Sequence, residues 1–232
     1  MSPSAFSPTP VLSPLGDCAL VIRFGEVLAP ECNDRVHALS AALAALPGLR
    51  DRVPAYSSLT LHYDPLHWRY AELAAAIAPY LDRSEASPGP GRQITLPVCY
   101  GGAFGPDLDE VARHARMRPD EVIARHTGGD YRVYFLGFSP GFPYLGGLAP
   151  ELATPRRATP RTQVPAGAVG IAGAQTGIYP QATPGGWQLI GRTPLVLFDP
   201  DAASPCLLAP GDRLRFVAIT PDEFARLAGG RP

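Results

Sequence analysis

Lysine is absent from this chain of 232 residues, in which all 20 basic residues are arginine. The absence excludes a Schiff-base lysine, a biotin-carrying lysine and the lysine of a phosphate-binding P-loop. The four cysteines form no Cys-x-x-Cys pair, so neither a disulfide framework nor a thiolate zinc site is indicated. We expect free, mostly buried thiols in a reducing compartment.

Several other signals are missing. There is no HExxH and no histidine pair at zinc-ligand spacing, so we expect no metal site. There is no Walker A, no GxGxxG after a strand and no GxSxG elbow, because the serine of Gly137–Gly141 precedes a proline. No membrane span or signal peptide is visible, so we expect a soluble, cytoplasmic protein. A net charge of −1 argues against nucleic acid or an anionic membrane as the main partner.

The first part of the chain alternates between strand and helix patterns. Residues 1–14 are rich in Ser and Pro, which predicts a flexible leader, and residues 82–92 have the composition of a linker. The order β-α-β-β-α-β predicts a ferredoxin-like split α+β domain over residues 15–92. The expected elements are Gly16–Phe24, Pro30–Leu46, Arg52–Ala55, Ser58–Tyr63, Trp68–Leu81 and Gln93–Tyr100.

After the strand Gln93–Tyr100, the rest of the chain to residue 232 begins with two short helices and continues mainly as strands. Asp107 and Glu110 are placed as N-cap and N3 acid of the first helix, and Pro119 starts the second. Many short strands joined by Gly/Pro turns predict a closed barrel or a sandwich, followed by a helix at Pro221–Leu227. The expected strands are Tyr131–Leu136, Val169–Ala172, Trp187–Arg192, Val196–Phe198 and Arg213–Ala218.

The segment Gly137–Pro194 contains 11 glycines and 9 prolines in 58 residues. Disordered tracts lack bulky apolar side chains, but this segment is threaded with aromatic residues. Gly and Pro among aromatics indicate an ordered, turn-rich surface, which is more often a binding site than a connector. The candidate ligand-contacting rings are Phe138, Phe142, Tyr144, Tyr179 and Trp187.

Three arginines lie on a proline-braced loop, Thr154–Gly167, within this segment. A guanidinium presented by rigid backbone can bind a carboxylate or phosphate through two hydrogen bonds. We favour this role for Arg156 and Arg161 over Arg157. The alternative is that all three are solvated or paired with nearby acids.

Four further side chains supply hydrogen-bonding groups. His126 ends the second short helix, where an imidazolium is a favourable cap; the alternative is an acid–base role. Gln175, Thr176 and Tyr179 offer an amide, a hydroxyl and a phenol, which would either bind a small polar ligand or brace the loops. The residues alone do not define a reaction.

These segments resemble the family of the 5-oxoprolinase B-type subunit, which is of carboxyltransferase subdomain C/D type. The family is also known as allophanate hydrolase subunit 1 and as the Kip-type inhibitor of a sporulation histidine kinase. Weaker similarity extends from about residue 15 to 228. The segments that carry the resemblance are Val53–Tyr56, Leu96–Gly102, Phe104–Leu108, Phe135–Leu148, Thr154–Gly167, Gly170–Tyr179 and Pro184–Pro194.

The resemblance implies an N-terminal α+β domain followed by a cyclophilin-like β-barrel. It also implies two partners, a larger C-type subunit and a lactam-hydrolysing A-type subunit, in a complex that uses ATP to convert 5-oxo-L-proline to L-glutamate. ATP would be bound by the complex rather than by this chain alone, and biotin would not be attached to this chain.

The main hypothesis is that this chain forms half of a composite active site and is inactive alone. We expect catalytic roles for His126, Arg161 and Gln175, with His126 carrying the proton. Two alternatives remain open: an inhibitor module that binds a histidine kinase, and a carboxyltransferase component of a urea carboxylase or allophanate pathway. The expected substrate contacts are Phe138, Phe142, Tyr144, Arg156, Thr176, Tyr179 and Trp187.

Overall fold

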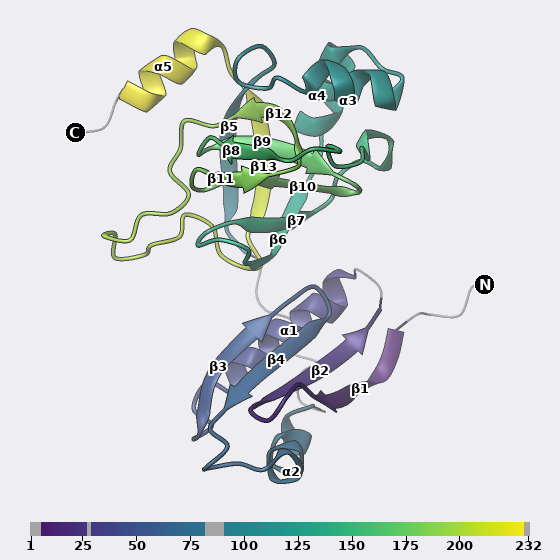
Figure 1. Ribbon diagram of the computed structural model, residues 1–232, viewed down its shortest axis with the longest axis vertical. Helices are drawn as coiled ribbons and strands as arrows, with labels where there is room; N and C mark the ends of the chain where they lie inside the picture. The colour runs from purple at the N-terminus through teal and green to yellow at the C-terminus, as the bar shows by residue number, and fades with distance from the viewer. Residues whose placement is uncertain (1–5, 27–28, 82–90, 230–232) are drawn as a thin grey trace. The chain divides into compact units, whose positions relative to one another are not determined.

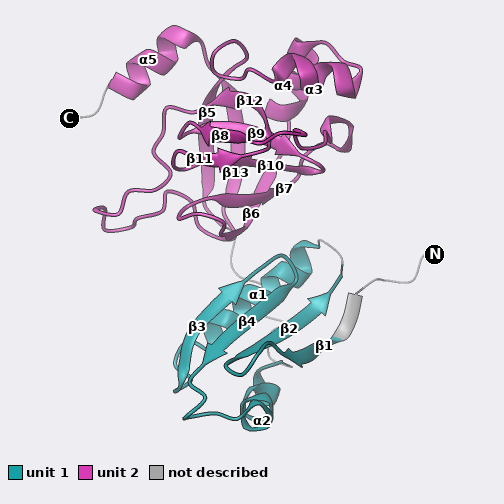
Figure 2. Cartoon of the chain, in the orientation of Figure 1, with its two compact units in different colours: residues 1–90 teal, residues 91–232 magenta. Residues whose placement is uncertain are grey.

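The computed structural model describes residues 6–26, 29–81 and 91–229. The chain forms two compact units, residues 1–90 and residues 91–232 (Figure 2). Within the described residues, no helix is long and apolar enough to cross a membrane. The four cysteines are free, as predicted, but only Cys32 and Cys99 are buried.

Unit 1 is a four-stranded antiparallel sheet in the order β1-β2-β4-β3, with two helices packed on it (Figure 1). Leu20, Ile22 and Phe24 alternate inward along β2, and Leu59 and Leu61 do so along β4, as expected for a half-buried sheet. The elements are β1 (Phe6–Pro14), β2 (Ala19–Gly25), α1 (Pro30–Ala42), β3 (Leu49–Pro54), β4 (Ser58–Tyr63) and α2 (Tyr70–Leu81).

Two predictions for this unit are wrong. Residues 6–14 of the expected leader form strand β1, and Gln93–Tyr100, taken as the last strand of a ferredoxin-like unit, belongs to the barrel. The observed order is therefore β-β-α-β-β-α. The prolines of β1 are compatible with a strand because β1 lies at the sheet edge, where a missing N–H costs no ladder hydrogen bond.

Unit 2 is built on a closed seven-stranded barrel in the order β10-β7-β6-β13-β5-β12-β9 (Figure 1). Its pairs are antiparallel except β13–β5, which is parallel. A two-stranded sheet, β8–β11, lies outside this ring. The strands are β5 (Gln93–Tyr100), β6 (Tyr131–Leu136), β7 (Pro143–Gly146), β8 (Arg161–Val164), β9 (Ala168–Ala172), β10 (Gln175–Ile178), β11 (Thr183–Gly185), β12 (Gln188–Arg192) and β13 (Arg213–Ala218).

The helices of unit 2 are α3 (Leu108–Ala115), α4 (Pro119–Thr127) and α5 (Pro221–Gly229), with a 3₁₀ turn at Pro150–Leu152. α3 and α4 pack together, and their buried residues join the interior of the barrel. The expected strand Val196–Phe198 is not formed; Phe198 makes only an isolated bridge to Cys206. A mainly-β barrel is therefore confirmed for this unit.

Candidate functional site

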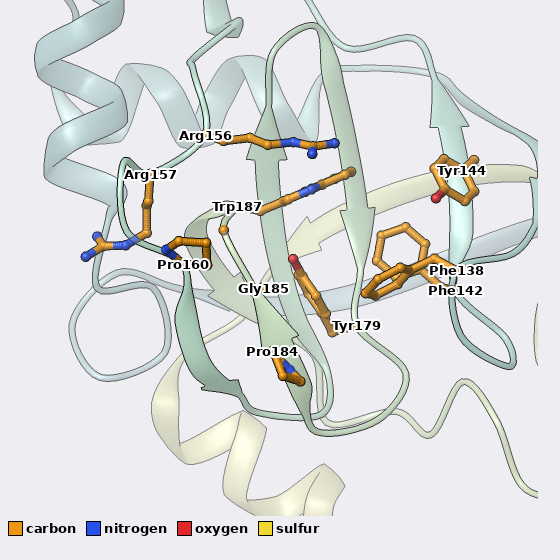
Figure 3. Close-up of a pocket in the computed structure, with 11 residues that line it drawn as sticks. Phe138, Phe142, Tyr144, Arg156, Arg157, Pro160, Tyr179, Pro184, Gly185 and Trp187 are labelled. Carbon is orange, nitrogen blue, oxygen red and sulfur yellow. The ribbon is translucent and has the colours of Figure 1, made fainter.

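A pocket of about 480 Å³ opens between the aromatic and arginine-bearing loops of unit 2 (Figure 3). The loops are brought together by the β9–β10, β9–β12 and β8–β11 pairings, although they are distant in sequence. Its lining consists of five aromatic residues, two arginines, and prolines and glycines: Phe138, Phe142, Tyr144, Arg156, Arg157, Pro160, Tyr179, Pro184, Gly185, Gly186 and Trp187.

Three buried rings, those of Phe142, Tyr179 and Trp187, form the inner wall. Phe142 meets Tyr179 at 5.4 Å and Trp187 at 5.6 Å between ring centroids, in edge-to-face geometry. Such packing holds each ring in one orientation, so the wall has a fixed shape before any ligand binds.

Glycines leave room for these rings. A Cβ at Gly177 would lie 2.9 Å from the Phe142 ring, and one at Gly185 would lie 2.5 Å from the Tyr179 hydroxyl. Both glycines are therefore required by the aromatic wall itself. This is a physical reason for the glycine content of the segment.

Phe138 lines the mouth of the pocket and is 64% exposed. Its φ of +62° places it in the left-handed region, which is uncommon for a non-glycine residue. The Ser139 N–H donates to the Gly137 carbonyl at 2.7 Å, which closes a tight turn centred on Phe138. Strain at an exposed aromatic residue beside a pocket is typical of a functional position.

The three arginines of the loop have different environments. The Arg156 side chain extends over Trp187, whereas Arg157 points away from the rings (Figure 3). Arg157 Nη1 and Arg161 Nη2 donate to the Asp107 carboxylate at 2.9 and 2.7 Å. Arg157 and Arg161 are thus paired with an acid, and Arg156 is the guanidinium directed at the pocket.

Asp107 was predicted only as a helix N-cap. It does precede α3, but its side chain makes no capping hydrogen bond. The carboxylate instead accepts from Arg157, Arg161 and the Leu189 backbone N–H, which lies 2.7 Å away. An acid before a helix can either cap the helix or pair with distant basic residues. The sequence does not show which distant residues lie close to it, so it cannot decide between the two roles.

His126 lies inside the barrel with no exposed surface. Its Nδ1 is 2.8 Å from the Tyr100 hydroxyl and its Nε2 is 3.0 Å from the Thr176 hydroxyl. The Thr176 hydroxyl donates to the Gly170 carbonyl, so it accepts from His126 Nε2–H, and Tyr100 donates to Nδ1. Burial lowers the pKa of His126 to about 3, so the ring is neutral.

The predicted site residues therefore divide into two groups. Phe138, Phe142, Tyr144, Arg156, Tyr179 and Trp187 line the pocket, whereas His126, Arg161, Gln175 and Thr176 are not among its lining residues. Thr176 is buried in the histidine network, and Gln175 begins strand β10. The structure does not bring His126 to the pocket surface, where a proton carrier would be needed.

The pocket has the electrostatics of an anion site. Among the described residues that line it, two are arginines and none is acidic. Burial raises the pKa of Tyr179, against the opposing effects of the Trp187 backbone N–H, Arg156 and Arg161, so its phenol is protonated at neutral pH. In the described parts of the chain, no group of three or more His, Cys, Asp or Glu side chains is arranged to hold a metal ion.

Comparison with known proteins identifies the family. The model of the carboxyltransferase domain, subdomain C and D, matches residues 10–208. The chain is 46% identical over 224 residues to the B-type subunit of 5-oxoprolinase from Bacillus subtilis, covering 90% of this chain and 93% of the relative. The chain belongs to the 5-oxoprolinase B-type family. It is also 44% identical over 203 residues to the B-type subunit of 5-oxoprolinase from Escherichia coli O157:H7, covering 88% of this chain and 93% of the relative.

Among solved structures, TTHA0988 superposes with a TM-score of 0.76 at 43% identity, covering 87% of this chain. The chain spans 40% of the length of TTHA0988. For a member of the 5-oxoprolinase B-type family, the pocket supplies binding groups: a guanidinium, a phenol and a rigid aromatic wall. None of the described residues that line it is Ser, Cys, His, Asp or Glu, so the lining holds neither a nucleophile–base pair nor a carboxylate base.

Proposed function

We propose that this chain is the B-type subunit of an ATP-dependent 5-oxoprolinase complex that converts 5-oxo-L-proline to L-glutamate. The observation that carries the proposal is the chain's identity to the Bacillus subtilis relative, which is named as a 5-oxoprolinase component, over nearly the whole of that relative. The chemistry of the pocket supports it.

5-Oxo-L-proline is a flat five-membered lactam with one carboxylate. Arg156 would bind that carboxylate through paired N–H groups, with no competing acid among the described residues of the pocket lining. The ring would lie against the aromatic wall, where Tyr179, as a neutral phenol, can donate a hydrogen bond to the lactam oxygen. Phe138 would cover the mouth of the pocket.

The composition of the pocket lining is our reason for including partner subunits in the proposal. Opening an unstrained lactam is uphill near neutral pH, and transfer of a phosphoryl group from ATP to the carbonyl oxygen, with release of ADP, would activate the lactam. Because the described pocket lining has neither a nucleophile nor a carboxylate base, we place these steps in a site shared with a larger C-type subunit and a lactam-hydrolysing A-type subunit. The complex, rather than this chain alone, would bind ATP.

The roles of three residues change in this proposal. His126 is no longer assigned as the proton carrier, because both ring nitrogens are engaged inside the barrel and the imidazole is neutral. Arg161 is paired with Asp107 and acts behind Arg156. Gln175 is not in the pocket lining, so it is no longer assigned a catalytic role.

The test is ATP-dependent glutamate release from 5-oxo-L-proline by this chain co-purified with the two partner subunits. Arg156→Ala should raise KM at least about tenfold, since a charge-assisted hydrogen bond contributes about 1.5–3 kcal/mol. Arg226→Ala, which removes an exposed arginine on α5, is the matched control and should leave KM unchanged.

Two results would count against the proposal. If the fully assembled complex released no glutamate, the 5-oxoprolinase assignment would fail, and urea carboxylation would be assayed next. If the purified chain hydrolysed 5-oxo-L-proline without partners, the composite site would be wrong. An unchanged KM in Arg156→Ala would remove Arg156 from the site.

A further inference from the structure

Asp107 uses both oxygens of a carboxylate that is almost completely buried. Its Oδ1 accepts from Arg157 Nη1 at 2.9 Å and from Arg161 Nη2 at 2.7 Å. Its Oδ2 accepts from the Leu189 backbone N–H at 2.7 Å. The side chain of Asp107 is 6% exposed, whereas those of Arg157 and Arg161 are 37% and 22% exposed.

These contacts connect the two walls of the pocket. Leu189 lies on β12, two residues after Trp187, and Asp107 also donates its own N–H to the Leu189 carbonyl at 2.9 Å. The carboxylate is therefore fixed to the strand that follows the aromatic wall. The same carboxylate also binds Arg157 and Arg161, which lie on the arginine loop Thr154–Gly167.

The backbone of the arginine loop is also hydrogen-bonded to β12 and to a residue just before it. Gln188 Nε2 donates to the Pro155 carbonyl at 3.0 Å, and the Arg157 N–H donates to the Gly186 carbonyl at 2.8 Å. These bonds fix the start of the loop. Asp107 fixes the guanidinium groups, because it forms the ion pair of both Arg157 and Arg161.

We propose that Asp107 is a positioning residue that holds Arg157 and Arg161, and with them the loop carrying Arg156, in the arrangement that binds an anionic substrate. The identity of that substrate rests on the proposed function; the positioning role does not. One carboxylate against two guanidiniums leaves one positive charge behind Arg156, which favours a ligand with a carboxylate or phosphoryl group.

An asparagine at position 107 has nearly the same shape but only one acceptor oxygen. The Leu189 N–H and the two guanidiniums are all hydrogen-bond donors. The NH₂ group of the asparagine is also a donor, so it would lose the hydrogen bond on whichever side it faced. Asp107→Asn should therefore weaken the attachment of the Arg157 and Arg161 guanidiniums without creating a cavity, while the Gln188–Pro155 and Arg157–Gly186 hydrogen bonds remain.

Asp212→Asn is the matched control. Asp212 is also buried, accepts from Arg92 Nε at 3.0 Å and from the Ala209 N–H at 2.7 Å, and is not among the pocket-lining residues. The two variants lose the same kind of ion pair. Only Asp107→Asn should affect the pocket.

The first measurement is made on the purified full-length chain and needs no turnover. Hydrogen exchange of the segment 155–163 and trypsin cleavage after Arg157 and Arg161 should rise at least tenfold in Asp107→Asn and stay at the wild-type level in Asp212→Asn. Equal protection of this segment in the two variants would overturn the positioning role.

The second measurement is the KM for 5-oxo-L-proline in the co-purified complex. Asp107→Asn should raise KM about tenfold with kcat within about threefold of wild type, whereas Asp212→Asn should change neither. A loosened loop with an unchanged KM would overturn the link to substrate binding. An inactive wild-type complex would refute the proposed function, while the exchange result would still decide whether Asp107 orders the loop.

If Asp107→Asn does not fold, Arg161→Gln replaces it. That variant removes the 2.7 Å contact and leaves Asp107 paired with Arg157, so the carboxylate is not left alone. The segment 155–163 should again exchange faster and KM should rise, by less than in Asp107→Asn. No change in either quantity would contradict the proposal.

Discussion

The hydroxyl of Tyr100 lies 2.8 Å from Nδ1 of His126, inside a closed barrel where the imidazole has no exposed surface. With Thr176 on Nε2, both nitrogens of the ring are satisfied by neutral partners. Tyr131 donates to the His126 carbonyl at 2.8 Å, and the Phe216 ring lies 4.4 Å from the imidazole between centroids. The network therefore ties α4 to β5, β6 and β10 through a buried, neutral imidazole.

This arrangement predicts that the barrel is sensitive to acid. The pKa of His126 is about 3 in the folded state, against 6.5 for the free side chain. Below pH 6.5 the unfolded state binds a proton that the folded state does not, so stability falls as pH drops from about 6.5 towards 3. The slope from this one group approaches about 1.4 kcal/mol per pH unit.

The measurement is urea unfolding between pH 4 and 8, followed by Trp187 fluorescence in a Trp68→Phe background. His126→Gln should be less stable at pH 8 but should show a shallower decline below pH 6. His114→Gln, at an exposed position on α3, should keep the wild-type slope. Parallel pH profiles for wild type and His126→Gln would show that His126 titrates normally.

A second prediction concerns the adjacent glycines 185 and 186. A Cβ at Gly185 would meet the Tyr179 hydroxyl at 2.5 Å, while one at Gly186 would meet Pro160 at 3.6 Å, an ordinary contact. Tyr179 is 1% exposed and cannot easily move. Gly185→Ala should therefore lower stability by about 1–3 kcal/mol and raise KM, whereas Gly186→Ala should change neither by much.

Thermal unfolding and KM in the complex measure both effects. Removing the hydroxyl should recover part of the loss, so Gly185→Ala combined with Tyr179→Phe should be more stable than Gly185→Ala alone. If the two alanine variants behaved alike, the Tyr179 hydroxyl would not occupy the position described.

The strands that could be predicted from the sequence are those with a clear pattern of apolar residues of their own. Tyr131–Leu136 and Arg213–Ala218 were predicted with the observed bounds, because alternating apolar residues are bounded by turn signals. Strands β8, β10 and β11 were not predicted, because three or four residues show no periodicity and these strands depend on partners elsewhere in the chain. Strand β1 was missed because its prolines suggested a leader.

The site shows the same division. Aromatic residues among Gly and Pro predict an ordered, ring-lined surface, and the five aromatic residues singled out for it line the pocket. The partners of Arg161 could not be predicted, because Asp107 is 54 residues away and its position before α3 already had a local explanation. For His126, the helix end was predicted correctly, but the closure of the barrel around it depends on β5, β10 and β13 together.

The last prediction concerns Phe138, whose backbone is left-handed. Substitutions at this residue can distinguish the effect of backbone strain on stability from the effect of the ring on substrate binding. Glycine adopts this conformation at no steric cost, whereas alanine does not, so Phe138→Gly should be more stable than Phe138→Ala by about 1 kcal/mol. Both variants lack the ring at the pocket mouth, so both should raise KM to the same extent. Arg116, with φ of +56° at the end of α3, is the control site.

Arg116→Gly should likewise be more stable than Arg116→Ala, with KM unchanged in both, because Arg116 is not among the pocket-lining residues. Thermal unfolding gives the order of stability, and KM in the complex gives the effect of the ring. If the Phe138 ring serves only in packing, its loss should leave KM unchanged. If the ring covers bound substrate, KM should rise even in Phe138→Gly, whose backbone is relaxed. Because Phe138 is 64% exposed, its removal leaves no cavity that would confuse the two effects.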